Sequence, residues 1–101
     1  MTTVRVFWLD GIATGGLGAK LPYLSRSVTD AEPYKPISTA PSPRKATHAL
    51  VQIPKGCAVL MELNPPNRTQ DADRDSPMLE AGNHIIQVGE SYSFSFLDAT
   101  E

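Results

Sequence analysis

Three aspartates that alternate along a polar stretch are the first residues whose spacing suggests chemistry. Asp71, Asp73 and Asp75 place carboxylates two positions apart, and Ca²⁺ binds clusters of carboxylate oxygens. A calcium loop of the EF-hand type also requires glycine at its sixth position and a carboxylate at its twelfth. This chain has Ser76 and Gly82 at those positions. The pattern therefore favours a solvated or partner-facing loop, and the sequence leaves the alternative of a bound cation open.

The other reactive side chains lack the spacing that a metal or catalytic site requires. His48, Cys57 and His84 are far apart in the sequence, whereas structural zinc takes four ligands in paired clusters. Cys57 stands in an apolar stripe, which favours a small core residue over a nucleophile with a neighbouring base. The glycine-rich stretch Gly15 to Gly18 is followed by Pro22 and not by a helix, so it does not fit a phosphate-binding loop. We therefore expect no catalytic residues, no cofactor, no metal and no enzymatic activity.

Composition and charge restrict the class of protein further. The chain has 101 residues, and we expect a single domain over residues 1–101. Hydrophobic residues make up 41% of the chain and charged residues 20%, as is ordinary for a globular domain. The net charge of −2 and the scattered lysines and arginines argue against nucleic-acid binding. No run approaches the roughly 18 apolar residues of a membrane span, and the N-terminal residues lack a signal-peptide core. The expected compartment is therefore the cytosol of the producing cell. With a single cysteine, stability must come from packing or from partners, so we expect a homo-oligomer, a dimer or trimer.

Alternating apolar residues and turn signals predict an all-β fold. Thr3 to Asp10 alternates as a strand does, with aromatic and β-branched residues. Ala46 to Asn64 predicts a hairpin that turns at Ile53 to Gly56, because proline and glycine suit the corners of a tight turn. Met78 to Leu97 predicts a second hairpin that turns at Val88 to Ser91. Short strands with turns between them indicate a small β-sandwich or a jelly-roll-like barrel.

A long irregular segment, here called the arm, precedes the first predicted hairpin and covers about residues 11–45. Its many prolines leave room only for short edge strands, at Tyr23 to Val28 and at Lys35 to Ser38, because proline removes a backbone donor from the ladder. We expect the arm to lie over a neighbouring chain and not to pack in its own core. The residues predicted to contact a partner are Arg5, Tyr23, Tyr34 and Lys35.

A series of strand and turn motifs runs from Ile37 to Phe96. The motifs are Ser38-Thr39-Ala40-Pro41, the strand Ala46 to Val51, the strand Ala58 to Leu60 that ends in Asn64-Pro65, and Met78 to Gly82 ahead of Ile86 to Ser91. This series, with Thr2 to Val6 at the N-terminus, resembles the small virion structural proteins of tailed bacteriophages. The shared pattern consists of strands and turns without a reactive signature, so it transfers no catalytic residues.

The resemblance implies a head-associated structural protein, made in the host cytoplasm and located in the virion. The role that the resemblance favours is a decoration or cement protein on the capsid surface, which clamps neighbouring major capsid proteins. Such a protein needs no small-molecule substrate. A head–tail connector or tail accessory protein is the alternative within the same particle. A third possibility is a sugar- or peptide-binding β module, for which Phe7 and Trp8 would form an exposed aromatic platform. Burial of these two rings would argue against that third function.

Overall fold

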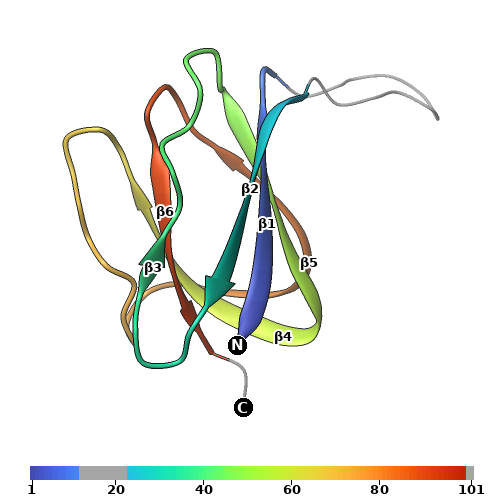
Figure 1. The fold of residues 1–101 in the computed structure, drawn as a ribbon, viewed down its shortest axis with the longest axis vertical. Coiled ribbons are helices and arrows are strands. Elements are labelled where there is room, and N and C mark those ends of the chain that lie inside the picture. The colour runs from blue at the N-terminus through green and yellow to red at the C-terminus, as the bar shows by residue number, and fades with distance from the viewer. Residues whose placement is uncertain (12–22, 100–101) are drawn as a thin grey trace.

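Six strands follow the alternating apolar stretches in the computed structural model, which describes residues 1–11 and 23–99. They are β1 (Thr2–Leu9), β2 (Tyr23–Ala31), β3 (Ile37–Ser38), β4 (His48–Asn64), β5 (Met78–Gln87) and β6 (Ser93–Asp98). All pairings among them are antiparallel, and they form one nearly closed sheet (Figure 1). The predicted all-β, barrel-like fold class is confirmed.

The long strand β4 belongs to both sides of the barrel. Residues 48–52 of β4 lie between β1 and β5, whereas residues 59–64 pair with β6. The strand order is therefore β2-β1-β4-β6-β3, with β5 on the other edge of β4. No ladder joins the two end strands, β2 and β3, within the described residues. Just after β2, the Asp98 N–H donates a backbone hydrogen bond to the Glu32 carbonyl over 2.9 Å and links this side of the barrel to β6.

The segment Ile53 to Gly56 is a bend within β4 and not the turn of a hairpin. The β4–β5 ladder is interrupted between Ile53 and Ala58, and Gly56 has a φ of +81°. Opposite Ile53, Gly82 of β5 has a φ of +128°. Glycine adopts these angles without a steric penalty, so both strands bend together and carry the sheet around the corner. The hairpin predicted over residues 46–64 is therefore wrong, because the chain bends here without reversing.

The second predicted hairpin, Met78 to Leu97, is also wrong in its pairing. Both β5 and β6 are strands, but they lie on opposite edges of β4 and do not pair with each other. Val59 of β4, for example, has Leu79 of β5 on one side and Asp98 of β6 on the other. Consecutive strands do form two antiparallel pairs in the described part of the chain, and these pairs are β1–β2 and β4–β5.

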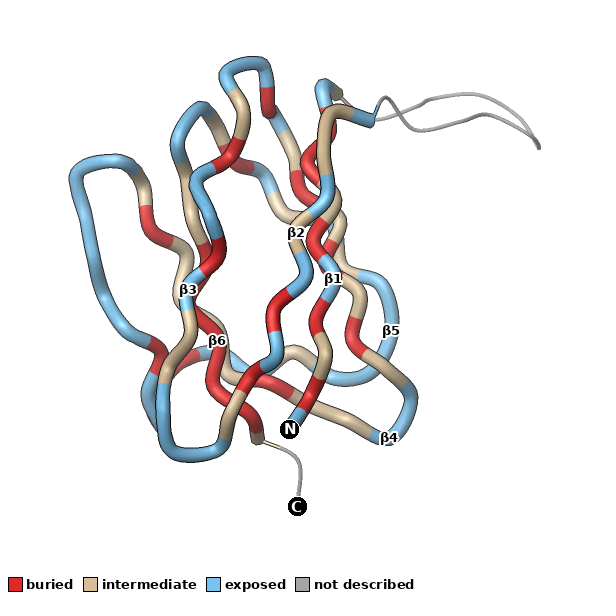
Figure 2. The backbone as a smooth tube through the Cα atoms, in the orientation of Figure 1, coloured by how far each residue is buried: buried red, intermediate tan, exposed pale blue. Residues whose placement is uncertain are grey.

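Most of the arm is part of the domain. Its two strands, β2 and β3, are edge strands as the prolines predicted, since β2 pairs only with β1 and β3 only with β6. Ala31, Thr39 and Ser42 are buried, and the buried and exposed residues that alternate along β2 are visible in Figure 2. The expectation that the arm does not pack in its own core is therefore wrong for residues 23–45. The glycine-rich stretch Gly15 to Gly18 lies outside the described residues.

Stacked aromatic rings form the centre of the core. The Trp8 and Phe94 rings stack at 5.5 Å between centroids, and the Phe94 and Phe96 rings stack at 5.7 Å. Four fully buried valines surround them, Val4, Val6, Val51 and Val59. Because β1, β4 and β6 all contribute, the core spans both halves of the sheet and fixes the strands that carry the outer surface.

Candidate functional site

Four neighbouring strands, β2, β1, β4 and β5, present an unusually apolar outer surface. The ladder registers place Arg26, Phe7, Leu50 and Ile85 in one row across these strands, and Val28, Arg5, Gln52 and Asn83 in the next row. We call the outward side chains of these two rows, together with Tyr23, the outer face. An antiparallel sheet that faces water usually carries polar residues on its wet side, so the apolar row requires an explanation.

An aromatic pair and three exposed side chains define the apolar part of the outer face. The Phe7 and Tyr23 rings lie 6.0 Å apart between centroids, tilted by 55°. Together with Leu50 they line a shallow hollow on this side of the sheet. Tyr23, Val28 and Ile85 are 60%, 54% and 49% exposed. Exposed apolar groups that cluster in this way are typical of surfaces that bind other macromolecules.

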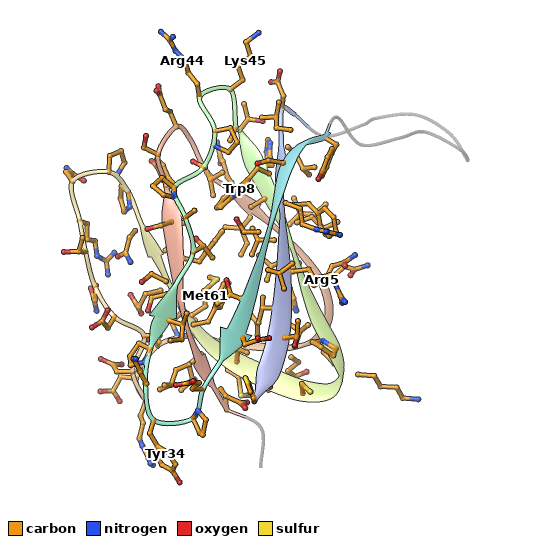
Figure 3. The ribbon with its side chains drawn as sticks, in the orientation of Figure 1. Arg5, Trp8, Tyr34, Arg44, Lys45 and Met61 are labelled. Atoms are coloured by element: carbon orange, nitrogen blue, oxygen red, sulfur yellow. The ribbon has the colours of Figure 1, made fainter. Side chains whose placement is uncertain are left out.

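Two arginines lie among these apolar side chains. Arg5 and Arg26 are exposed, and Figure 3 shows Arg5 pointing away from the barrel, whereas Trp8 and Met61 lie within it. Within the described part of the chain, neither arginine takes part in an ion pair. The outer face therefore offers apolar area together with uncompensated positive charge. Tyrosine and arginine are also the residues that contribute most often to the binding energy of protein interfaces.

The structure separates the four predicted contact residues into two places. Arg5 and Tyr23 both lie on the outer face. Tyr34 and Lys35 lie in the turn between β2 and β3, at the opposite end of β2 (Figure 3). Tyr34 is 90% exposed and borders a second hollow, which Leu60 also lines. Arg5 and Tyr23 therefore share one surface, whereas Tyr34 and Lys35 lie beyond the far end of β2.

Trp8 and Phe7 do not form an aromatic platform. Trp8 is only 1% exposed, stacks on Phe94 and directs its indole N–H toward the Ser27 hydroxyl at 3.4 Å. Phe7 points to the other side of β1 and pairs with Tyr23. The burial of Trp8 argues against a Phe7–Trp8 platform, whereas Phe7 itself is only half-buried.

The aspartate loop is organised by its own hydrogen bonds. The Asp73 carboxylate accepts the Asp75 N–H at 2.9 Å and the Ser76 hydroxyl at 3.3 Å. The Ala72 N–H, in turn, donates to the Ser95 hydroxyl at 2.9 Å and attaches the loop to β6. Asp73 thus acts as a local turn residue. The described residues contain no group of three His, Cys, Asp or Glu side chains that could hold a metal ion.

The histidines and the cysteine have ordinary local surroundings. His48 Nδ1 lies 2.9 Å from the Thr47 hydroxyl, and His84 Nε2 lies 2.8 Å from the Glu80 carbonyl oxygen. Cys57 is partly buried and packs against the core cluster, as expected of a small core residue.

The predicted contact residues did not include Phe7, Leu50 or Ile85, and the sequence suggested Phe7 only as part of an aromatic platform with Trp8. A signal was present, since β1 and β4 carry apolar residues on both of their faces, including Phe7 and Leu50 on the nominally wet side. What the sequence did not provide was the register, which is needed to see that these residues align across four strands. The row becomes visible only when β5 is placed next to β4.

The chain matches no protein-family model, no curated protein and no solved structure. Among the described residues, no helix is long and apolar enough to cross a membrane.

Proposed function

We propose that this chain is a non-enzymatic structural protein of a tailed-bacteriophage virion. Its proposed role is that of a decoration or cement protein, which binds the major capsid protein at the capsid surface through the outer face. The observation that carries the proposal is the run of apolar side chains Phe7, Leu50 and Ile85 across β1, β4 and β5, with the exposed Tyr23 of β2 beside Phe7. The virion assignment extends the resemblance of the strand and turn motifs.

The composition of the outer face suits attachment to another protein. Ile85 is 49% exposed, so covering it contributes about half of the roughly 1.5–3 kcal/mol that burial of a whole side chain of its size gives. Arg5 would then face acidic groups of the partner, which favours one orientation of binding more than it adds affinity. A single copy of such a small face binds weakly, but repeated copies on a symmetric shell gain avidity.

A rigid scaffold holds the outer face in place before binding. β1 and β4 are paired on both sides over the outer face. In the described part of the chain, no buried side-chain nitrogen or oxygen lacks a hydrogen-bond partner. Little conformational entropy is therefore lost when the outer face is covered, which supports a clamping role.

Attachment to shells of the phage that encodes the chain tests the proposal. Purified shells and protein are co-sedimented, with Tyr23→Ala and Ile85→Lys as outer-face variants. We expect both variants to reduce the bound fraction at least tenfold while retaining the thermal stability of the wild type, since both side chains are about half exposed. Binding of both variants at the wild-type level would contradict the assignment of this face.

Tyr34→Ala is the matched control, because it makes the same change on an exposed side chain at the other end of β2. We expect it to bind as the wild type does. Loss of binding by Tyr34→Ala alone would move the contact to the turn after β2. A wild-type protein that stays in the supernatant and forms a closed ring by light scattering would favour the head–tail connector or tail accessory function instead.

A further inference from the structure

The free edge of β2 is a second surface that the proposed function does not use. β2 pairs with β1 from Tyr23 to Ala31 except at Leu24, where the register shifts, and no ladder occupies its other edge within residues 1–11 and 23–99. We propose that two copies of the chain pair antiparallel through these edges, with a two-fold axis at Val28. A free strand edge presents backbone donors and acceptors in a row and readily pairs with a strand of another chain.

The outward side chains of β2 determine which copies can pair. Arg26, Val28 and Asp30 are exposed and lie on the outer face of the sheet, while Thr29 and Ala31 are buried on the inner side. Side chains alternate along a strand, so a one-residue slip would place an outward residue of one copy beside an inward residue of the other. Only registers in which outward residues oppose outward residues are compatible with both cores.

Among the registers centred on Arg26, Ser27 or Val28, one is complementary in charge. With the axis at Arg26, this residue opposes itself and two positive charges meet. With the axis at Ser27, Arg26 opposes Val28. With the axis at Val28, the two Val28 side chains meet, and each Arg26 opposes Asp30 of the other copy. Directly opposed unlike charges and apolar pairs both stabilise antiparallel strands, while like charges destabilise them.

The charges that this register requires are available. Neither Arg26 nor Asp30 takes part in an ion pair within the described residues, and the Asp30 carboxylate accepts one hydrogen bond, from the Thr3 hydroxyl at 2.8 Å. A carboxylate accepts several hydrogen bonds, so the contact with Thr3 leaves room for the arginine of a second copy. A patch that is its own complement is the requirement for a two-fold dimer.

The dimer extends the sheet across both copies. The four strands that carry the outer face continue through the two β2 strands into the same four strands of the second copy. Both outer faces then lie on one side of an eight-stranded sheet. The inference does not depend on the proposed function, because edge pairing requires no shell. If both are correct, the dimer presents twice the attachment surface.

Charge reversal tests the register in solution. The mass is measured by sedimentation equilibrium over a range of protein concentrations, for the wild type, Arg26→Asp, Asp30→Arg and the double variant. We expect the wild type to reach twice its monomer mass of 10.9 kDa. Each single reversal places like charges opposite each other twice, so we expect the dimer dissociation constant to rise about tenfold or more. The double variant restores opposite charges and should restore the dimer.

Arg44→Asp is the control for the change of net charge, because Arg44 is exposed in the segment before β4 and away from the β2 edge (Figure 3). We expect it to dimerise as the wild type does. A wild type that stays monomeric at millimolar concentration would overturn the proposal. So would a dimer that tolerates both single reversals, or a double variant no better than the single ones.

A cross-link provides an independent measurement at the axis. Val28→Cys in a Cys57→Ser background places two thiols directly opposite each other, at a Cα separation of about 4.5–5.5 Å that a disulfide can span. We expect mild oxidation to give a covalent dimer in high yield. Lys45→Cys in the same background is the exposed control and should not cross-link in this way. Equal yields from the two variants would contradict the two-fold axis at Val28.

Discussion

Ser42→Ala is predicted to destabilise the domain, because the Ser42 side chain replaces a missing stretch of ladder. Past β3, Pro41 and Pro43 have no backbone N–H to donate to β6. The Ser42 hydroxyl instead donates to the Gly89 carbonyl at 2.6 Å and accepts the Tyr92 N–H at 2.8 Å. It thereby fastens the segment after β3 to the turn that precedes β6.

The magnitude follows from the hydrogen bonds that are lost and kept. Alanine removes both bonds of the hydroxyl, while the Ser42 N–H still donates to the Tyr92 carbonyl at 2.7 Å. Each bond contributes about 1 kcal/mol, so we expect a loss of about 2 kcal/mol in the free energy of unfolding. For a domain of this size, such a loss lowers Tm by roughly 10 °C.

Thermal and urea unfolding of Ser42→Ala measure this loss, with Ser38→Ala as the matched control. Ser38 lies in β3 of the same segment and its side chain is exposed. We expect Ser38→Ala to unfold within about 2 °C of the wild type, since exposed substitutions have small effects. Hydrogen exchange at the Tyr92 amide should accelerate only in Ser42→Ala. Equal Tm values for the two variants would refute the reasoning.

Three further changes test the core, the bend and the long loop. Trp8→Ala removes a fully buried ring and should cost about 3–5 kcal/mol in chemical denaturation, or prevent folding. Gly82→Ala, at a φ of +128°, should lower the free energy of unfolding by about 1–3 kcal/mol, which is more than Gly56→Ala, at +81°. Neither new methyl group meets an atom within 4 Å, so the cost must come from the backbone angle. A cost near zero at both positions would contradict this origin. Asn64→Ala removes two hydrogen bonds to the backbone of Gln70, so limited proteolysis within residues 65–77 should become faster. An unchanged cleavage rate would show that these bonds do not hold the loop.

Local patterns in the sequence predicted the strands but not their partners. Alternation identified β1, β6 and both halves of β4, and proline content predicted β2 and β3 as edge strands. The Ile53 to Gly56 motif fits a tight turn and a bend equally well. What decides between them is that β1 pairs with the first half of β4 while β6 pairs with the second half. That choice depends on contacts far apart in the sequence, which no local pattern contains.

The candidate site was predicted only in part, because its residues come together through the same long-range pairing. Arg5 and Tyr23 were predicted as contact residues, and both lie on the outer face. Tyr34 and Lys35 were grouped with them because all belong to or adjoin the arm in sequence. In the structure, however, Tyr23 begins β2, whereas Tyr34 and Lys35 follow the last residue of β2. Residue types indicated a binding role, whereas the surface that they share depends on the register of the sheet.

Side-chain footprinting on shells tests the central claim most directly. Free protein and shell-bound protein are exposed to hydroxyl radicals, and oxidation is measured at Tyr23, Ile85 and Tyr34, which are all exposed in the isolated chain. The account predicts strong protection of Tyr23 and Ile85 in the bound protein, with Tyr34 oxidised as in the free protein. Unchanged oxidation of Tyr23 and Ile85 on a chain that sediments with the shells would contradict attachment through the outer face.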